Sequence, residues 1–193
     1  MRRLWLPIVA TLCLAGCSDD PSWRTTDITE IMPPLDFALI DDDGEAVTAE
    51  AYRGKTTLVY FGYTQCPDVC PITLARLGSV INQLDEDVRD EVQVLFVSVD
   101  PGRDTPEVLK RYVGAFGPEF TGLTGEREDI DALTNRYRIA YEYEEPNEYG
   151  DYIVNHSSAI FAFDEEGHAQ FLARDSHSPQ DILGDLRTLI SKS

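Results

Sequence analysis

Runs of consecutive apolar residues alternate with segments of helical periodicity along most of this chain. Two such runs, residues 57–61 and 92–99, predict buried strands at the centre of a sheet, because apolar side chains would cover both faces of each strand. Shorter strands are predicted at residues 35–40, 46–48, 120–123, 139–143, 152–154, 158–163 and 169–172. Helices are predicted at about residues 72–87, 105–116, 126–138 and 178–190.

Turn and cap residues indicate how these elements connect. Asp-Asp-Asp-Gly at residues 41–44 predicts the turn of an N-terminal hairpin, and Asp-Glu-Glu-Gly at 164–167 predicts a second hairpin. Thr105 followed by Pro106 predicts the start of a helix. Helices that alternate with buried strands indicate an α/β protein with a central mixed sheet flanked by helices. Their order matches a thioredoxin-like fold with an N-terminal β-hairpin extension, which we expect over residues 35–193.

The first residues of the chain have the features of an export signal. Two arginines precede an almost wholly apolar segment, and Leu-Ala-Gly-Cys at residues 14–17 has the pattern of a bacterial lipoprotein cleavage site. An ordinary signal peptide and an uncleaved anchor helix are the alternatives. The apolar segment, residues 4–14, is short for an anchor, because a spanning helix needs about 20 apolar residues. We therefore predict a lipoprotein signal peptide over residues 1–16 and a lipid on Cys17.

A lipid on Cys17 would attach the protein to a bacterial cell envelope, with the folded domain facing the periplasm. Residues 17–34 are then predicted to form a tether between the lipid and the domain. Ser18 follows the lipidated residue, so the simplest sorting rule does not signal retention in the inner membrane.

The chain is strongly acidic. It has 16 basic and 35 acidic side chains, a formal net charge of −19. Nucleic acid is therefore not expected as a ligand, because binding phosphate requires the opposite charge. A solvated surface accounts for the acidity, and a basic protein partner is the alternative interpretation.

The four cysteines leave one pair in the predicted domain. Cys13 lies in the apolar leader and Cys17 is the predicted lipidation site, so that Cys66 and Cys70 remain. A disulfide-stapled scaffold and a zinc site made of four cysteines are thereby excluded. Three residues separate the pair, whereas the thioredoxin-like redox motif has two.

The cysteine pair follows a predicted strand and precedes a predicted helix. Pro71 is tolerated only in the first turn of a helix, which predicts that Cys66 lies on the loop and Cys70 at the helix start. The helix N-terminus is expected to lower the pKa of both thiols and so favour thiolates. A thiolate is both the nucleophile of disulfide exchange and a soft ligand for Cu(I).

His156 is the predicted third ligand. It stands in Asn-His-Ser-Ser at residues 155–158, before a strand that thioredoxin topology places beside the strand leading to the cysteines. Two thiolates and one imidazole suit both Cu(I) and Cu(II), and they also form a zinc ligand set. His168, on a turn, and His177, on a serine-rich loop, are expected to be exposed to solvent.

Three blocks of sequence together follow the pattern of a known family. They are Phe-Gly-Tyr-Thr-Gln-Cys-Pro-Asp-Val-Cys-Pro at 61–71, Ser-Val-Asp-Pro-Gly-Arg-Asp-Thr-Pro at 98–106, and Asn-His-Ser-Ser at 155–158. From about residue 35 to 190 the chain resembles the Sco/SenC family of copper-binding, thioredoxin-like proteins. The resemblance implies that Cys66, Cys70 and His156 bind copper. It also implies membrane anchoring, and a role in assembling the binuclear copper centre of cytochrome c oxidase.

The resemblance further implies partners. They are the copper-bearing subunit of cytochrome c oxidase and either a thioredoxin-like reductant or another copper chaperone. The family role also favours the inner membrane as the location. Two positions depart from the family pattern: Gln65 stands where many members have His, and Asn155 where they have Asp. Neither change removes a ligand, although Asn155 puts the copper affinity in question. Asp100 is either a support for the site or a turn residue before Pro101.

Other functions could use the same residues. A thiol–disulfide reductase would attack with Cys66 and resolve the mixed disulfide with Cys70, and this enzyme activity could coexist with copper binding. A peroxidase would form a sulfenic acid on one cysteine, but the sequence shows no arrangement of Thr and Arg near Cys66 that would clearly activate a peroxide, although Arg76 follows within the next helix turns. We predict a copper-binding assembly factor that delivers copper to the oxidase centre or prepares it, with thiol–disulfide reduction as the alternative.

Overall fold

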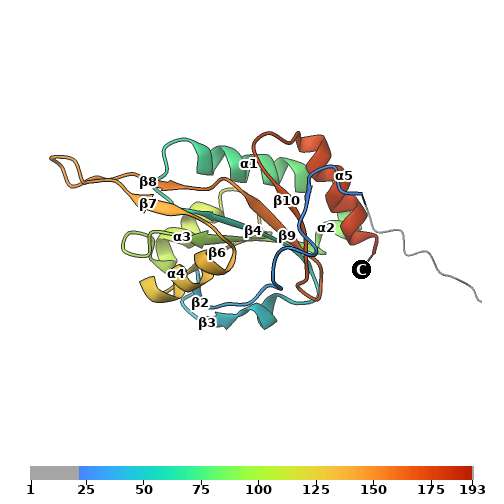
Figure 1. Cartoon of the computed structure of the whole chain (residues 1–193), viewed down its shortest axis with the longest axis horizontal. Helices are drawn as coiled ribbons and strands as arrows, with labels where there is room; N and C mark the ends of the chain where they lie inside the picture. Colours follow the sequence, from blue (N-terminus) through green and yellow to red (C-terminus); the bar gives the residue numbers. More distant parts are fainter. Residues whose placement is uncertain (1–21, 193) are drawn as a thin grey trace, which may run out of the picture.

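An eight-stranded mixed sheet forms the centre of the structure (Figure 1), a computed structural model that describes residues 22–192. Its strand order is β1-β10-β9-β4-β5-β6-β2-β3, and β7 and β8 form a separate two-stranded sheet. The strands are β1 (Thr26–Asp27), β2 (Ala38–Asp41), β3 (Ala46–Thr48), β4 (Thr56–Gly62), β5 (Val92–Ser98), β6 (Phe120–Thr124), β7 (Tyr141–Tyr143), β8 (Val154–His156), β9 (Ile160–Phe163) and β10 (Ala169–Ala173). The helices are the 3-10 helix η1 (Ala49–Tyr52), α1 (Val69–Ile81), α2 (Glu86–Arg89), α3 (Pro106–Val113), α4 (Arg127–Arg136) and α5 (Pro179–Ile190). The predicted signal peptide and Cys17 lie outside the described residues.

The two predicted central strands form the middle of the sheet. β4 and β5 pair in parallel, β6 continues the parallel part beside β5, and β9 pairs with β4 in the antiparallel sense. Every residue of β4 is buried, as the continuous apolar run requires. The predicted mixed α/β sheet and its N-terminal hairpin, β2–β3, are confirmed.

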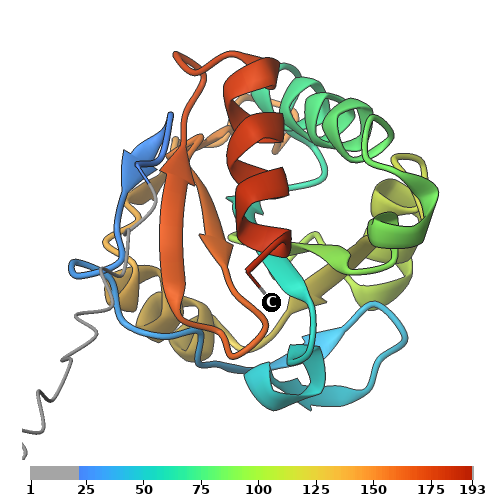
Figure 2. The ribbon, with the colours of Figure 1, turned by 90° about the vertical axis from the view of Figure 1, so that its right-hand side faces the viewer.

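Helices cover both faces of this sheet. On one face α1 and α5 lie side by side (Figure 2), and the Tyr60 hydroxyl points toward α1. The next residue along β4, Phe61, points to the opposite face because side chains alternate along a strand. There it packs on Tyr137, which follows α4, with 6.4 Å between the ring centroids.

The β7–β8 hairpin (residues 141–156) projects from the main body of the molecule (Figure 1). Tyr141 lies opposite His156 and Tyr143 opposite Val154 in its antiparallel ladder. The predicted strand at 152–154 therefore starts later and extends to His156, the last residue of β8.

Part of the predicted tether is folded against the domain. The carboxylate of Asp185 in α5, which is 2% exposed, accepts hydrogen bonds from the backbone N–H groups of Arg24 and Thr25 at 2.9 and 2.8 Å. β1 then pairs with β10, and Ile28 is buried. Residues 24–28 of the predicted tether are thus bound to the domain, which the polar composition of this segment does not reveal, because the anchor is formed by a distant helix and strand.

The predicted helix at residues 72–87 also differs from the structure. α1 begins at Val69, so that Pro71 lies in its first turn as expected, and it ends at Ile81. The short helix α2 is a separate element. Among residues 22–192, none of the helices combines the length and the apolar character that crossing a membrane requires.

Candidate metal centre

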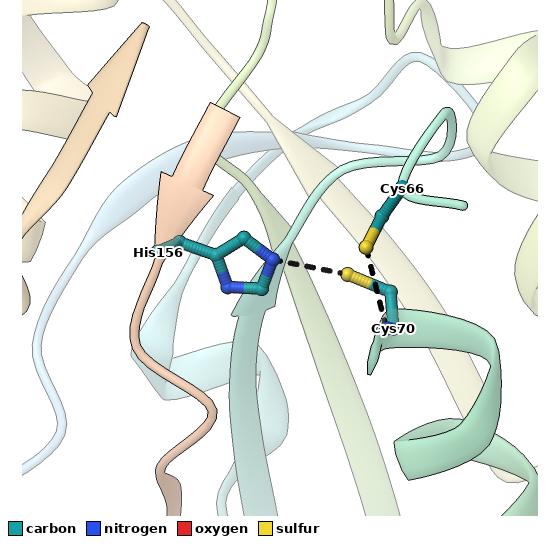
Figure 3. A group of neighbouring side chains, drawn as sticks. All are labelled: Cys66, Cys70 and His156. Atoms are coloured by element: carbon teal, nitrogen blue, oxygen red, sulfur yellow. Dashed lines mark hydrogen bonds between the residues drawn. The ribbon is translucent and has the colours of Figure 1, made fainter. Parts of the chain in front are cut away.

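Cys66, Cys70 and His156 meet at one end of the central sheet (Figure 3). Cys66 lies on the loop between β4 and α1 (residues 63–68, the Cys loop), Cys70 lies in the first turn of α1, and His156 ends β8. Their two sulfur atoms and a ring nitrogen all lie within 4.8 Å of one another. The fold thus brings together the three residues that the sequence singled out, from segments 86 residues apart.

The two sulfurs are free thiols in a mostly apolar environment. Cys66 is 8% exposed and Cys70 is fully buried. The Cys66 sulfur accepts a hydrogen bond from the backbone N–H of Cys70 at 3.4 Å, and the hydroxyl of Tyr60 lies 3.7 Å from the Cys70 sulfur. Burial raises the pKa of Cys70 to about 12. The expected lowering of its pKa by the helix N-terminus is therefore wrong, because the cost of burying a thiolate is larger.

The His156 ring is oriented by its neighbours. Its Nδ1 lies 3.0 Å from the carbonyl oxygen of Ser157, which can only accept, so Nδ1 carries the proton and Nε2 has the free lone pair. Nε2 faces the Cys70 sulfur at 3.2 Å (Figure 3). The rings of Tyr60 and Tyr63 make T-shaped contacts with the imidazole, at centroid distances of 6.1 and 5.8 Å. Burial lowers the pKa of His156, which keeps the ring neutral and its Nε2 available to a metal ion.

Asp104 fixes the start of the Cys loop. Its buried carboxylate accepts hydrogen bonds from the backbone N–H and the hydroxyl of Thr64 at 3.0 and 2.6 Å, and from the hydroxyl of Ser98 at 2.6 Å. Because Thr64 lies two residues before Cys66, this carboxylate joins the Cys loop to the end of β5. Burial raises the pKa of the Asp104 carboxyl. Sequence reasoning does not reveal this role, since Asp104 appears there only as part of the block at residues 98–106.

Asp100 takes part in the site through its neighbours. It is fully buried, forms an ion pair with Arg103 and accepts a hydrogen bond from the Tyr152 hydroxyl at 2.9 Å. Its backbone carbonyl also accepts from the N–H of Asp104 at 3.0 Å, which closes a turn. Both interpretations of Asp100 are therefore correct in part. Arg103, Tyr60 and Tyr63 were not singled out in the sequence, because nothing in the local pattern shows which distant residues they contact.

The other two histidines lie elsewhere. His168 is exposed, as predicted, and stands in a second group of potential ligands with Asp164 and Glu166. His177 is half-buried rather than exposed, and its Nδ1 accepts a hydrogen bond from the backbone N–H of Arg174 at 3.0 Å.

Gly62 provides the space in which the Cys70 sulfur lies. A Cβ atom at this position would lie 2.8 Å from that sulfur and 2.8 Å from a ring carbon of Phe96. Gly62→Ala is therefore expected to lower the free energy of unfolding by about 1–3 kcal/mol. Urea unfolding of the metal-free protein measures this. Gly102→Ala is the control, because the nearest atom to its Cβ would be 4.0 Å away; equal stabilities of the two variants would contradict the prediction.

Comparison with known proteins agrees with this fold. The family model described as SCO1/SenC matches residues 29–191. A SCO2-like protein of Rickettsia prowazekii is 39% identical over 132 residues, which cover 68% of this chain and 64% of the relative's own length.

Two solved structures of related proteins superpose over most of the chain. Copper-bound ScoI of Arabidopsis thaliana has a TM-score of 0.77 and 35% identity, covering 83% of this chain and 99% of its own. Copper-bound ScoI of Bradyrhizobium japonicum has a TM-score of 0.73 and 35% identity, and the match covers 81% of this chain and 98% of the ScoI chain. Since the family model extends from before β2 to the end of α5, this chain belongs to the SCO1/SenC family.

Proposed function

We propose that this protein binds copper through Cys66, Cys70 and His156 and serves in the assembly of the binuclear copper centre of cytochrome c oxidase. The observation that carries the proposal is the convergence of two thiol sulfurs and a neutral imidazole nitrogen within 4.8 Å. The copper-bound structures of two ScoI proteins, each 35% identical to this chain, support copper as the metal. The oxidase role is the one implied by the family resemblance.

The chemistry of the three side chains fits copper in both oxidation states. Thiolates are soft ligands that suit Cu(I), and an imidazole nitrogen helps to accommodate Cu(II). His156 needs no proton rearrangement, because its Nε2 already has the lone pair. Cys70 must lose its proton when a metal binds, and the raised pKa makes that step costly until the metal compensates for the charge.

The partners and location follow from the same role. The copper-bearing subunit of cytochrome c oxidase would receive the metal or be prepared for it. A thioredoxin-like reductant or another copper chaperone would supply electrons or copper. With a lipid on Cys17, the protein would be attached to the bacterial cell envelope and face the periplasm, with the inner membrane favoured by the oxidase role.

Copper titration of the His156→Ala variant tests the ligand assignment. Because losing an outer partner of a ligand already costs about 10–100-fold in affinity, losing the imidazole is expected to cost at least about 100-fold for Cu(II). Cu(I) affinity should fall much less, since both sulfurs remain. The charge-transfer absorption of thiolate-bound Cu(II) and a competing Cu(I) chelator measure the two affinities.

His177→Ala is the matched control for this titration, because His177 belongs to neither group of potential metal ligands among the described residues. It should bind both copper ions as the wild type does. Unchanged Cu(II) affinity in His156→Ala would show that the ligand assignment is wrong.

Thiol–disulfide exchange is the second candidate function, favoured by two adjacent free cysteines. Cys66 is the more accessible sulfur, so its thiolate would attack a partner's disulfide. The Cys70 thiolate would then displace the partner, which leaves a Cys66–Cys70 disulfide here and transfers two electrons to the partner as a dithiol. The raised pKa of Cys70 disfavours this second step. Copper binding ranks first because the copper-bound structures of two related proteins support it.

A further inference from the structure

The β7–β8 hairpin carries His156 but is not part of the central sheet. Within the described residues, its two strands pair only with each other. A two-stranded hairpin is at best marginally stable by itself. Both cysteines, in contrast, are buried in the core, Cys66 on the Cys loop and Cys70 in the first turn of α1. The distance between the imidazole and the sulfurs therefore depends on the contacts that hold this hairpin against the Cys loop.

Arg103 makes such contacts from the segment between β5 and α3. Its Nη1 donates to the side-chain oxygen of Gln65 at 3.2 Å, next to Cys66, and to the carbonyl oxygen of Tyr152 at 3.1 Å. Its guanidinium carbon lies 3.6 Å from the centroid of the Tyr152 ring and 5.6 Å from that of Tyr63. One side chain thus joins two residues of the Cys loop to Tyr152, which lies in the hairpin just before the strand that ends at the histidine.

Asp100 holds Arg103 in this position. The guanidinium donates through Nε to its carboxylate, which is fully buried, and the Tyr152 hydroxyl donates to the same carboxylate at 2.9 Å. The contacts also continue to the candidate ligand, because the Tyr63 ring packs against the imidazole of His156. Asp100 therefore fixes both the arginine and the hairpin residue on which it stacks.

We propose that Arg103 is a positioning residue for the metal site: anchored on Asp100, it clamps the β7–β8 hairpin against the Cys loop and sets the distance of His156 from the two sulfurs. This inference rests on the proposed copper function. Two thiolates satisfy Cu(I), whereas Cu(II) also needs the imidazole. Loss of the clamp therefore weakens Cu(II) binding and largely spares Cu(I) binding.

The Arg103→Lys variant tests this role. Lysine keeps a positive charge beside the buried Asp100, so the fold is retained, but it lacks the planar fork of donors that contacts both segments. Cu(II) affinity is expected to fall about 10-fold, as for other residues that orient a ligand. Cu(I) affinity should stay close to the wild-type value, and the charge-transfer band of bound Cu(II) should shift.

A measurement without metal tests the clamp directly. In the metal-free Arg103→Lys protein, amide hydrogen exchange across residues 144–153 is expected to be about 10-fold faster than in the wild type, because the hairpin opens more often. Tyr152→Leu removes the stacked ring from the other side while it keeps the ion pair of Arg103 with Asp100. It should show the same selective loss of Cu(II) affinity.

Arg136→Lys is the matched control, since Arg136 donates to the carbonyl of Pro34 and pairs with Asp36 at 3.8 Å. It should leave copper affinities and hairpin exchange unchanged. Wild-type Cu(II) affinity or wild-type hairpin exchange in Arg103→Lys would overturn the positioning role. If the wild-type protein bound no copper, the proposed function would fail instead, while the exchange measurement would still decide whether Arg103 clamps the hairpin.

Discussion

Replacing Cys70 by serine is expected to lower the affinity for copper by more than about 100-fold in both oxidation states, since removal of a ligand should exceed the 10–100-fold cost of losing its supporting contacts. Cys70 lies at the centre of the trio: its sulfur is 3.2 Å from Nε2 of His156, and its N–H donates to the sulfur of Cys66. A serine hydroxyl is a hard donor with little affinity for Cu(I). The loss should therefore differ from that in His156→Ala, which is selective for Cu(II).

The folded state of the Cys70→Ser variant has to be checked separately, because the side chain is fully buried. Serine is slightly smaller than cysteine and can accept a hydrogen bond from the nearby Tyr60 hydroxyl, so urea unfolding of the metal-free variant should remain cooperative. A competition titration with a Cu(I) chelator measures the affinity. Cu(I) binding equal to that of the wild type, in a folded variant, would exclude Cys70 as a ligand.

Replacing Asp104 by alanine should have the largest effect on stability. The change leaves the backbone N–H of Thr64 and two hydroxyl groups without their acceptor in a buried place, which is expected to cost about 3 kcal/mol of unfolding free energy. Asp104→Asn is the matched variant, because its amide has the same shape, accepts from the N–H and can donate to a hydroxyl oxygen. In urea unfolding, the free energy of unfolding of Asp104→Asn should be close to that of the wild type, and that of Asp104→Ala should be far lower. Equal losses in both variants would contradict a role based on hydrogen bonds.

The unfolding free energies of the wild type and of Asp104→Asn are expected to depend differently on pH. Burial raises the pKa of the Asp104 carboxyl above its ordinary value of 3.8, so the native state binds a proton more readily than the unfolded chain does. The contribution of Asp104 to stability therefore decreases as the pH rises from about 3.8 through the raised pKa. Asp104→Asn lacks this titration, so the stability of the wild type relative to Asn should increase on acidification. A constant difference across that range would show that the pKa is not raised.

The fold could be predicted from sequence where it depends on apolar runs and strong turn signals. The predicted strands at 57–61 and 92–99 correspond to β4 and β5 within one residue at each end, because a strand buried on both faces has an unmistakable pattern. The start of the folded domain could not be predicted in this way. Residues 24–28 look like a polar linker, but their backbone groups bond to segments far away in sequence: residues 24 and 25 to the carboxylate of Asp185, and residues 26–28 to β10.

The candidate site shows the same division. Cys66, Cys70 and His156 could be identified because the fold class dictates which strand ends lie side by side. The contacts of Arg103 with the Cys loop and the hairpin could not be predicted, since they join residues on two segments that are distant in sequence. The sequence predicts a lowered pKa for Cys70 and is wrong in direction, because the position of Cys70 at a helix N-terminus is visible in the sequence but its complete burial is not.

If Cys17 carries a lipid, the attachment of residues 24 and 25 to Asp185 limits the distance between the domain and the membrane. Only residues 17–23 would then lie between the lipid and the first fixed point, and a fully extended chain of that length spans at most about 25 Å. β1 lies toward the end of the molecule opposite the β7–β8 hairpin (Figure 1). A connecting segment this short would keep the β1 end of the domain near the bilayer, with the cysteines and His156 at the end that faces the aqueous side. The protein would then receive and release its cargo at a nearly fixed height above the membrane.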